Sequence, residues 1–149
     1  MAIARLRGIV RLVHPFPSTL DAVVTGVIAA LAGADALRVL HLAVSMLAIQ
    51  GAIGAANDWA DAPADATSRP SKPIPAGLVS RSFAARVAMA AGALGVGLAA
   101  LLGPLPLAIA ALGLAVGLAY DLRLKGTRWS WLPYAVGIPL LPVYAWVGA

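Results

Sequence analysis

The sequence has no cysteine, no glutamate and very little charge. Without cysteine in its 149 residues, disulfides, thiolate metal sites and thiol nucleophiles are all excluded. The six acidic residues are all aspartates, and charged residues make up only 11% of the chain, against about a quarter in soluble domains. Because a soluble fold could not cover its surface with so few charges, the composition argues against a water-soluble domain.

The apolar residues are in excess and are gathered into five blocks. Hydrophobic residues form 61% of the chain, and the mean hydropathy is +0.89. A membrane-spanning helix needs about 17 to 25 apolar residues, and the blocks show no period-two alternation of the kind that favours strands. The sequence therefore predicts an all-α, polytopic bundle of about five transmembrane helices in a single membrane domain, residues 1–149, with blocks at about 16–34, 37–57, 83–102, 105–120 and 131–147.

The basic residues indicate how the helices are oriented. Ten of the eleven lie before the first block, around the connection between the second and third, or between the fourth and fifth; Arg38 is the exception. If the helices alternate in direction, those three segments share one side, which the positive-inside rule makes cytoplasmic. We expect an integral protein of the inner or plasma membrane, inserted in the lipid bilayer, with a cytoplasmic N-terminus. Because the positive charge is distributed between apolar blocks, the net charge of +5 does not indicate nucleic-acid binding.

The other connections and the N-terminus complete the expected topology. The turns near 33–36 and 103–106 are very short, so the helices that they join should be antiparallel neighbours. The basic segment 1–13 could mimic a signal peptide. The block after it is long enough to span the membrane and more blocks follow, so we interpret it as part of an uncleaved first helix.

Half of the acidic residues fall in one short stretch after the second block. Asp58, Asp61 and Asp65 have the spacing i, i+3, i+7, which places them on one face of a helix. Three carboxylates on one face repel each other unless a cation lies among them. Mg²⁺ typically uses one or two carboxylates together with substrate phosphates. The stretch therefore predicts a magnesium site for a phosphorylated ligand, in a cytoplasmic Asp-rich loop at residues 58–80, with Asn57 beside it.

Proline and basic residues follow the carboxylates. Inside a helix Pro63 would clash with the carbonyl of Trp59, so we expect the helix to end near Asp61 and Asp65 to lie on a turn or a new short helix. Arg69 and Lys72 come next, and guanidinium and ammonium groups suit phosphate binding. The alternative is a solvated, charged helix end with surface salt bridges. The concentration of aspartate at the membrane edge favours a functional site.

These residues resemble the first aspartate-rich motif of the UbiA-type intramembrane prenyltransferases. The resemblance is carried by Asn57-Asp58-x-x-Asp61-x-x-x-Asp65 and by Arg69-Pro70-x-Lys72-Pro73-Ile74-Pro75-x-Gly77. Two weaker similarities lie on either side. His14-Pro15-Phe16-Pro17 is similar to the start of the family's first helix, where Arg-Pro is more usual, and Tyr120-Asp121-x-x-Leu124-Lys125 is similar to the Tyr and Lys after its fourth.

The resemblance implies a prenyltransferase that uses Mg²⁺ to hold an isoprenyl diphosphate, whose ionisation gives an allylic cation for an acceptor to capture. It implies the following roles: metal ligands Asn57, Asp58, Asp61 and Asp65; catalytic residues Asp58 and Asp61; diphosphate-binding residues Asn57, Arg69, Lys72 and Lys125. Neither the acceptor nor the prenyl chain length can be predicted. The lone His14 and His41 are expected to be structural.

The resemblance covers only the N-terminal half of a fold of about nine helices, because no second aspartate-rich motif follows. Together with the end of the chain directly after its fifth block, this suggests an incomplete N-terminal half that needs a second chain or a missing C-terminal half. One alternative is a non-catalytic membrane module that assembles with another membrane protein. Another is a small transporter, which is disfavoured because transporter sites lie near the midplane of the bilayer.

Overall fold

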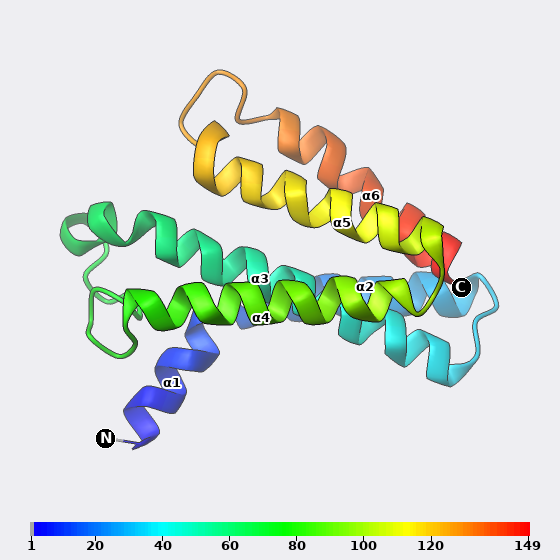
Figure 1. The fold of residues 1–149 in the computed structure, drawn as a ribbon, viewed down its shortest axis with the longest axis horizontal. Helices are drawn as coiled ribbons and strands as arrows, with labels where there is room; N and C mark the ends of the chain where they lie inside the picture. The colour runs from blue at the N-terminus through cyan, green and yellow to red at the C-terminus, as the bar shows by residue number, and fades with distance from the viewer. Residues whose placement is uncertain (1) are drawn as a thin grey trace.

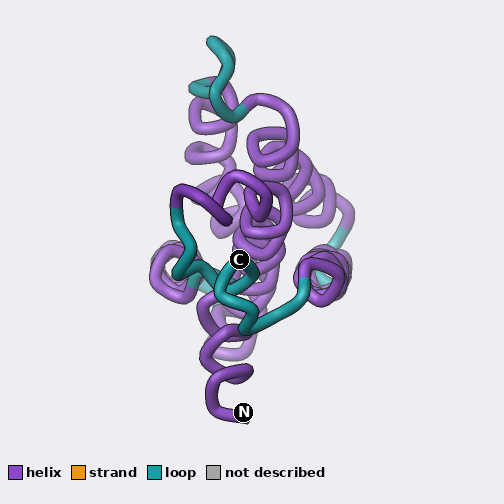
Figure 2. Tube along the Cα trace, turned by 90° about the vertical axis from the view of Figure 1, so that its left-hand side faces the viewer, coloured by secondary structure: helices purple, strands orange, loops and turns teal. Residues whose placement is uncertain are grey.

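The computed structural model describes residues 2–149, which form helices and connecting loops with no strand among them (Figure 2). The predicted all-α fold is confirmed. In chain order the elements are α1 (Ala2–Leu12), α2 (Pro15–Leu31), α3 (Ala36–Ser68), α4 (Arg81–Ala100), α5 (Pro104–Ala119), the π-helical segment η1 (Tyr120–Leu124) and α6 (Leu132–Gly148).

Each of the five apolar blocks has become a helix. Within residues 2–149, three helices are long and apolar enough to cross a membrane: α3, α4, and α5 continued by η1. A fourth candidate is the pair α1 and α2, which is bent by 52°. The remaining apolar helix, α6, has 17 residues and two internal prolines, Pro139 and Pro142. Residues 2–149 therefore contain three to four candidate membrane spans, whereas the five apolar blocks predicted about five.

Helix α3 is the centre of the bundle. It packs along α4 and α2, and it also contacts α5, η1 and α1, while α5 pairs with α6 (Figure 1). A buried polar chain fastens three helices together: the Tyr144 hydroxyl donates to Ser45 Oγ at 2.7 Å, and Ser45 Oγ donates to the Gly95 carbonyl at 2.8 Å. Such hydrogen bonds between helices replace the hydrophobic driving force that lipid does not provide.

Close approach of α3 and α4 depends on Gly95. A Cβ atom at this position would lie 2.6 Å from Ile49 Cγ1 and 3.0 Å from the Ile49 backbone nitrogen. Both distances are too short for a methyl group, so the two helix backbones can approach this closely only because residue 95 has no side chain.

The ends of the bundle differ in their connections. Helix α1, the loop between α3 and α4, and the connection between α5 and α6 lie towards the same end, with the short turns at the other (Figure 1). The short turns contain Gly33 at φ 95° and Gly103 at φ 122°, values that favour glycine. The predicted antiparallel packing of α2 with α3 and of α4 with α5 is confirmed.

The expectation that Pro63 ends the second helix is wrong. Helix α3 continues through Pro63 to Ser68, so residues 58–68 are helical, and only 69–80 form the loop that was predicted to cover 58–80. Proline cannot donate to the Trp59 carbonyl. That carbonyl instead accepts a hydrogen bond from Arg81 Nε at 3.0 Å, and the Arg81 guanidinium lies 4.7 Å from the centre of the Trp59 ring. The contact with Arg81 thus partly compensates for the helical hydrogen bond that the Trp59 carbonyl loses.

Candidate functional site

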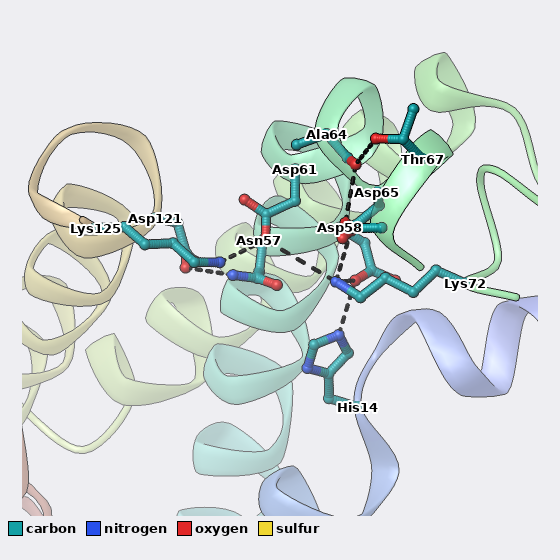
Figure 3. Close-up of polar contacts among 11 residues, drawn as sticks. His14, Asn57, Asp58, Asp61, Ala64, Asp65, Thr67, Lys72, Asp121 and Lys125 are labelled. Carbon is teal, nitrogen blue, oxygen red and sulfur yellow. Dashed lines mark hydrogen bonds and ion pairs between the residues drawn. The ribbon is translucent and has the colours of Figure 1, made fainter. Parts of the chain in front are cut away.

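The last turns of α3 carry three aspartates on one face. Since the helix is continuous, the spacing of Asp58, Asp61 and Asp65 brings their side chains together, as predicted (Figure 3). Asp58 and Asp65 are buried, with 2% and 4% of their surface exposed, and Asp61 is half-buried. Carboxylates buried side by side need a compensating cation.

Lys72 lies among these three carboxylates. Its Nζ atom is 2.9 Å from Asp58 Oδ1, 2.8 Å from Asp65 Oδ2 and 4.0 Å from Asp61 Oδ2. The loop folds back to place it there, with turns closed by hydrogen bonds from Lys72 N to Arg69 O and from Ala76 N to Lys72 O. Burial acts to lower the pKa of the Lys72 ammonium, but its contacts with Asp65 and Asp58 outweigh burial, so its pKa is raised above the ordinary value.

Lys125 reaches the cluster from the other side. Its ammonium pairs with Asp61 Oδ2. The backbone places it there through η1, where Lys125 N donates to the carbonyl of Tyr120 at 2.9 Å, five residues earlier. Such π-helical turns are frequent at functional sites. Lys125, which was predicted to bind the diphosphate, thus contacts the Asp-rich segment across the bundle.

Asp121, also on η1, joins the site through Asn57. Asn57 Nδ2 donates to Asp121 Oδ1 at 2.8 Å, while Asp121 itself is 8% exposed. Asp121 was not among the residues predicted to form the site. Its position between Tyr120 and Lys125, both within the similarity noted above, was the signal that could have identified it.

His14 is a second residue at the site that was not predicted to belong to it. It has a left-handed backbone, with φ 50° and ψ 66°, which is uncommon for a residue with a side chain. Its Nε2 atom lies 3.1 Å from Asp58 Oδ1. A Cβ atom on Gly54 would lie 3.1 Å from the His14 ring, so the glycine makes room for the imidazole. His14 was expected to be structural, but it contacts a predicted catalytic carboxylate directly.

Arg69 is the predicted site residue that is not brought into the cluster. Within residues 2–149, no ion pair joins its guanidinium to Asp58, Asp61 or Asp65. Its backbone N–H donates to the Asp65 carbonyl at 2.9 Å and closes the end of α3. Asp58, Asp61, Asp65, Lys72 and Lys125, by contrast, lie within one connected set of ion pairs. Asn57, next to Asp58 in the chain, pairs separately with Asp121.

A cavity of about 630 Å³ adjoins this set. His14, Asn57, Tyr120 and Asp121 line it where it meets the polar cluster, and apolar side chains from α2, α3, α5 and α6 line much of the remainder, including Ile28, Ile49, Ile109 and Leu140. One further polar pair lies in it, Gln50 Nε2 donating to Asp21 Oδ2 at 2.6 Å. A mainly apolar cavity with a few convergent polar groups is typical of a small-molecule site.

The residues present fit a hard divalent cation. Asp58 Oδ2 is buried and has no hydrogen-bond partner in the described part of the chain. The available donors are carboxylate and amide oxygens, which Mg²⁺ prefers. No group of three or more acidic or histidine side chains in residues 2–149 has a complete metal-binding arrangement. A divalent cation at these residues would therefore need further ligands from phosphate and water.

Comparison with known proteins identifies relatives for most of the chain. Residues 20–149 match the model of the UbiA prenyltransferase family. A digeranylgeranylglyceryl phosphate synthase of Methanopyrus kandleri is 39% identical over 124 residues, which are 82% of this chain and 45% of that protein. The synthase of the same name from Methanoregula boonei is 34% identical over 125 residues, 82% of this chain and 44% of that protein.

A solved structure extends the likeness to the fold. It comes from work on digeranylgeranylglyceryl phosphate synthase in membranes, and it superposes with a TM-score of 0.91 at 18% identity over 97% of this chain and 53% of that one. At this identity the likeness concerns the fold alone. The chain thus spans about half the length of the relatives that it matches.

Proposed function

Because the chain belongs to the UbiA prenyltransferase family, we propose that it forms the diphosphate-binding part of a membrane prenyltransferase. In the proposed reaction an isoprenyl group moves from an isoprenyl diphosphate to an acceptor, with Mg²⁺ as cofactor. The observation that carries the proposal is the Lys72 ammonium held among Asp58, Asp61 and Asp65. This face of α3 therefore already holds one positive group, the Lys72 ammonium, beside an apolar cavity.

The proposed roles follow from the contacts. Asn57, Asp58, Asp61 and Asp65 would hold Mg²⁺, which when bound neutralises the charge that develops on a leaving diphosphate. Lys72 and Lys125 approach Asp61 from opposite sides (Figure 3), where both ammonium groups can turn from carboxylate to diphosphate oxygens. Arg69, at the end of α3, would add a guanidinium to the same diphosphate. His14 holds Asp58 in place through Nε2.

The cavity is mainly apolar, which suits the isoprenyl chain of the proposed substrate. An isoprenyl chain is apolar, and side chains such as Ile49 and Ile109 line the cavity that leads away from the polar cluster. Apolar walls exclude water, which protects an allylic cation from hydrolysis. The carbon that leaves the diphosphate would therefore lie where the polar cluster meets the cavity, beside Asn57 and Asp121.

The position in the membrane completes the proposal. Ten of the eleven basic residues lie in segments at the end of the bundle that carries the site. By the positive-inside rule this end faces the cytoplasm, the side on which a water-soluble diphosphate head group would approach an inner or plasma membrane. The relatives are about twice as long as this chain. A second polypeptide segment, in the same or another chain, would supply the half of their fold that this chain does not cover.

The names of the two relatives suggest a class of acceptor. Both are digeranylgeranylglyceryl phosphate synthases, names that indicate a product with two geranylgeranyl groups on glyceryl phosphate. We propose a glyceryl phosphate that carries one prenyl chain as the acceptor for this chain. A non-catalytic membrane module is the competing reading, and it requires that the polar cluster bind no diphosphate.

A transfer assay tests the function. The purified chain in detergent would receive Mg²⁺, geranylgeranyl diphosphate and geranylgeranylglyceryl phosphate, with diphosphate release and prenylated product both measured. We expect Mg²⁺-dependent diphosphate release that Asp58→Asn reduces by at least about 100-fold, the scale of losing one preorganised charge-stabilising group. If the wild type and Asp58→Asn differ neither in diphosphate release nor in Mg²⁺-dependent binding of a non-hydrolysable prenyl thiodiphosphate, the proposed function is wrong.

A further inference from the structure

Asp121 has a carboxylate oxygen that no group of the described chain satisfies. The residue is 8% exposed, its Oδ1 accepts from Asn57 at 2.8 Å, and its Oδ2 is buried without a hydrogen-bond partner among residues 2–149. The residue also lines the cavity. A buried carboxylate oxygen without a partner costs free energy, so this atom is suited to a donor that a ligand brings.

The nearby cations are already engaged elsewhere. Lys125 follows Asp121 by one helical turn, but its ammonium pairs with Asp61, and Lys72 pairs with Asp58 and Asp65. Asn57, which is neutral, is the side chain that hydrogen-bonds to Asp121 within the described residues. Asp121 therefore differs from the three aspartates of α3, each of which forms an ion pair with an ammonium, whereas Lys125 acts on Asp121 only at longer range.

Its position ties Asp121 to the reacting end of the cavity. Asn57 is adjacent in sequence to Asp58, and Asn57 binds Asp121 directly. The other carboxylate in the cavity, Asp21, is deeper: its partner Gln50 precedes Asn57 by seven residues of α3, about 10 Å at the rise of an α-helix. A group that contacts a nucleophile next to the diphosphate must therefore be Asp121 rather than Asp21.

The charge of Asp121 selects the kind of group that it would contact. A carboxylate repels the diphosphate and the phosphate of an acceptor, and it attracts a neutral group that can donate a hydrogen bond. We propose that Asp121 Oδ2 accepts a hydrogen bond from the nucleophilic hydroxyl of the acceptor, and so holds that oxygen towards the carbon that leaves the diphosphate. This assignment rests on the proposed function and adds to it a residue that selects acceptors carrying a free hydroxyl.

Binding measurements test this without requiring turnover. The chain in detergent would be saturated with Mg²⁺ and a non-hydrolysable geranylgeranyl thiodiphosphate. It would then be titrated with geranylgeranylglyceryl phosphate, and separately with the analogue in which hydrogen replaces the free glycerol hydroxyl. We expect the wild type to prefer the hydroxyl compound by at least about tenfold, the value of one hydrogen bond to a charged group, and Asp121→Ala to remove the preference.

Two variants separate this role from others. Asp121→Ala should keep the Mg²⁺-dependent affinity for the thiodiphosphate, which Asp58→Ala should lose; equal loss in both variants would make Asp121 a metal ligand and overturn the inference. Asp121→Asn keeps the side-chain volume, which guards against a folding defect in the alanine variant. It should weaken the preference, because a charge-assisted hydrogen bond is about twice as strong as a neutral one.

The remaining outcomes distinguish this inference from the function on which it rests. If the wild type binds the thiodiphosphate but does not distinguish the two acceptors, or if both Asp121 variants keep the preference, the inference is wrong and the proposed function stands. If the wild type does not bind the thiodiphosphate with Mg²⁺ at all, the proposed function and this inference are both wrong.

Discussion

Arg81 Nε donates a hydrogen bond to the carbonyl oxygen of Trp59 at 3.0 Å, from the first residue of α4 to the carboxylate-bearing part of α3. The donor reaches the carbonyl that Pro63 leaves without its helical N–H, and the guanidinium also covers the Trp59 ring at 4.7 Å. Through this contact α4 supports the helical turns that hold Asp58, Asp61 and Asp65.

We predict that Arg81→Ala destabilises the protein by about 1 kcal/mol, the usual value of one hydrogen bond. The loss should be smaller in a Pro63→Ala background, because alanine restores the N–H that binds the Trp59 carbonyl. Thermal unfolding in detergent of the wild type, the two single variants and the double variant measures this coupling. Additive effects of the two substitutions would show that Arg81 does not compensate for Pro63.

Lys72 should compete with a metal ion for the carboxylates of α3. We predict that Lys72→Met raises the affinity for Mn²⁺, used as a spectroscopic substitute for Mg²⁺, by roughly tenfold in the absence of diphosphate, because the ammonium no longer neutralises Asp58 and Asp65. Electron paramagnetic resonance of free Mn²⁺ gives the affinity. Arg69→Met is the matched control: it removes one nearby positive charge that is not paired with these carboxylates within residues 2–149, and it should change the affinity much less.

The raised pKa of Lys72 sets a pH range for its contribution to stability. A lysine with a raised pKa in the folded state stabilises that state fully below its ordinary pKa and loses this effect as pH rises through the folded-state pKa. The difference in unfolding midpoint between wild type and Lys72→Met should thus be constant from neutral pH to about pH 10 and shrink above it. A difference that shrinks between pH 7 and 9 would contradict the ion pairs described here.

Two glycines of α4 give a matched test of the packing. Gly95→Ala should destabilise the protein by about 1 to 3 kcal/mol, because the new methyl group would meet Ile49 at 2.6 Å and the Ser45 carbonyl at 3.0 Å. Gly97→Ala meets no atom within 4 Å and should be neutral or stabilising, since alanine favours helix. Equal unfolding midpoints for the two variants would rule out the close approach of α3 and α4.

The parts of this structure that follow from local rules could be predicted from the sequence. Hydropathy and length located the apolar helices, the short connections between apolar blocks located the turns, and the i, i+3, i+7 spacing placed Asp58, Asp61 and Asp65 on one face. These properties depend only on residues close together in the chain, and the membrane amplifies them because backbone groups in lipid must be paired.

The errors and omissions all concern contacts between distant segments. Where α3 continues through Pro63, the Trp59 carbonyl accepts its hydrogen bond from Arg81, 22 residues later in the chain. Asp121 and His14 reach the site through Asn57 and Asp58, 64 and 44 residues away. The spacing of apolar or charged residues along the sequence does not predict contacts between such distant residues. The similarity around Tyr120 and Lys125 indicated the right segment, but the π-helical turn that orients Asp121 could not be seen in it.

The most direct test of the central claim is the binding of a non-hydrolysable prenyl thiodiphosphate to the purified chain in detergent. It would be measured with and without Mg²⁺, beside an Asp58→Ala/Asp61→Ala variant and an Asp35→Ala control, whose carboxylate caps the start of α3 at the opposite end. The account predicts Mg²⁺-dependent binding that the double variant loses and the control retains. Absence of binding in the wild type, or equal binding by the double variant, would contradict it.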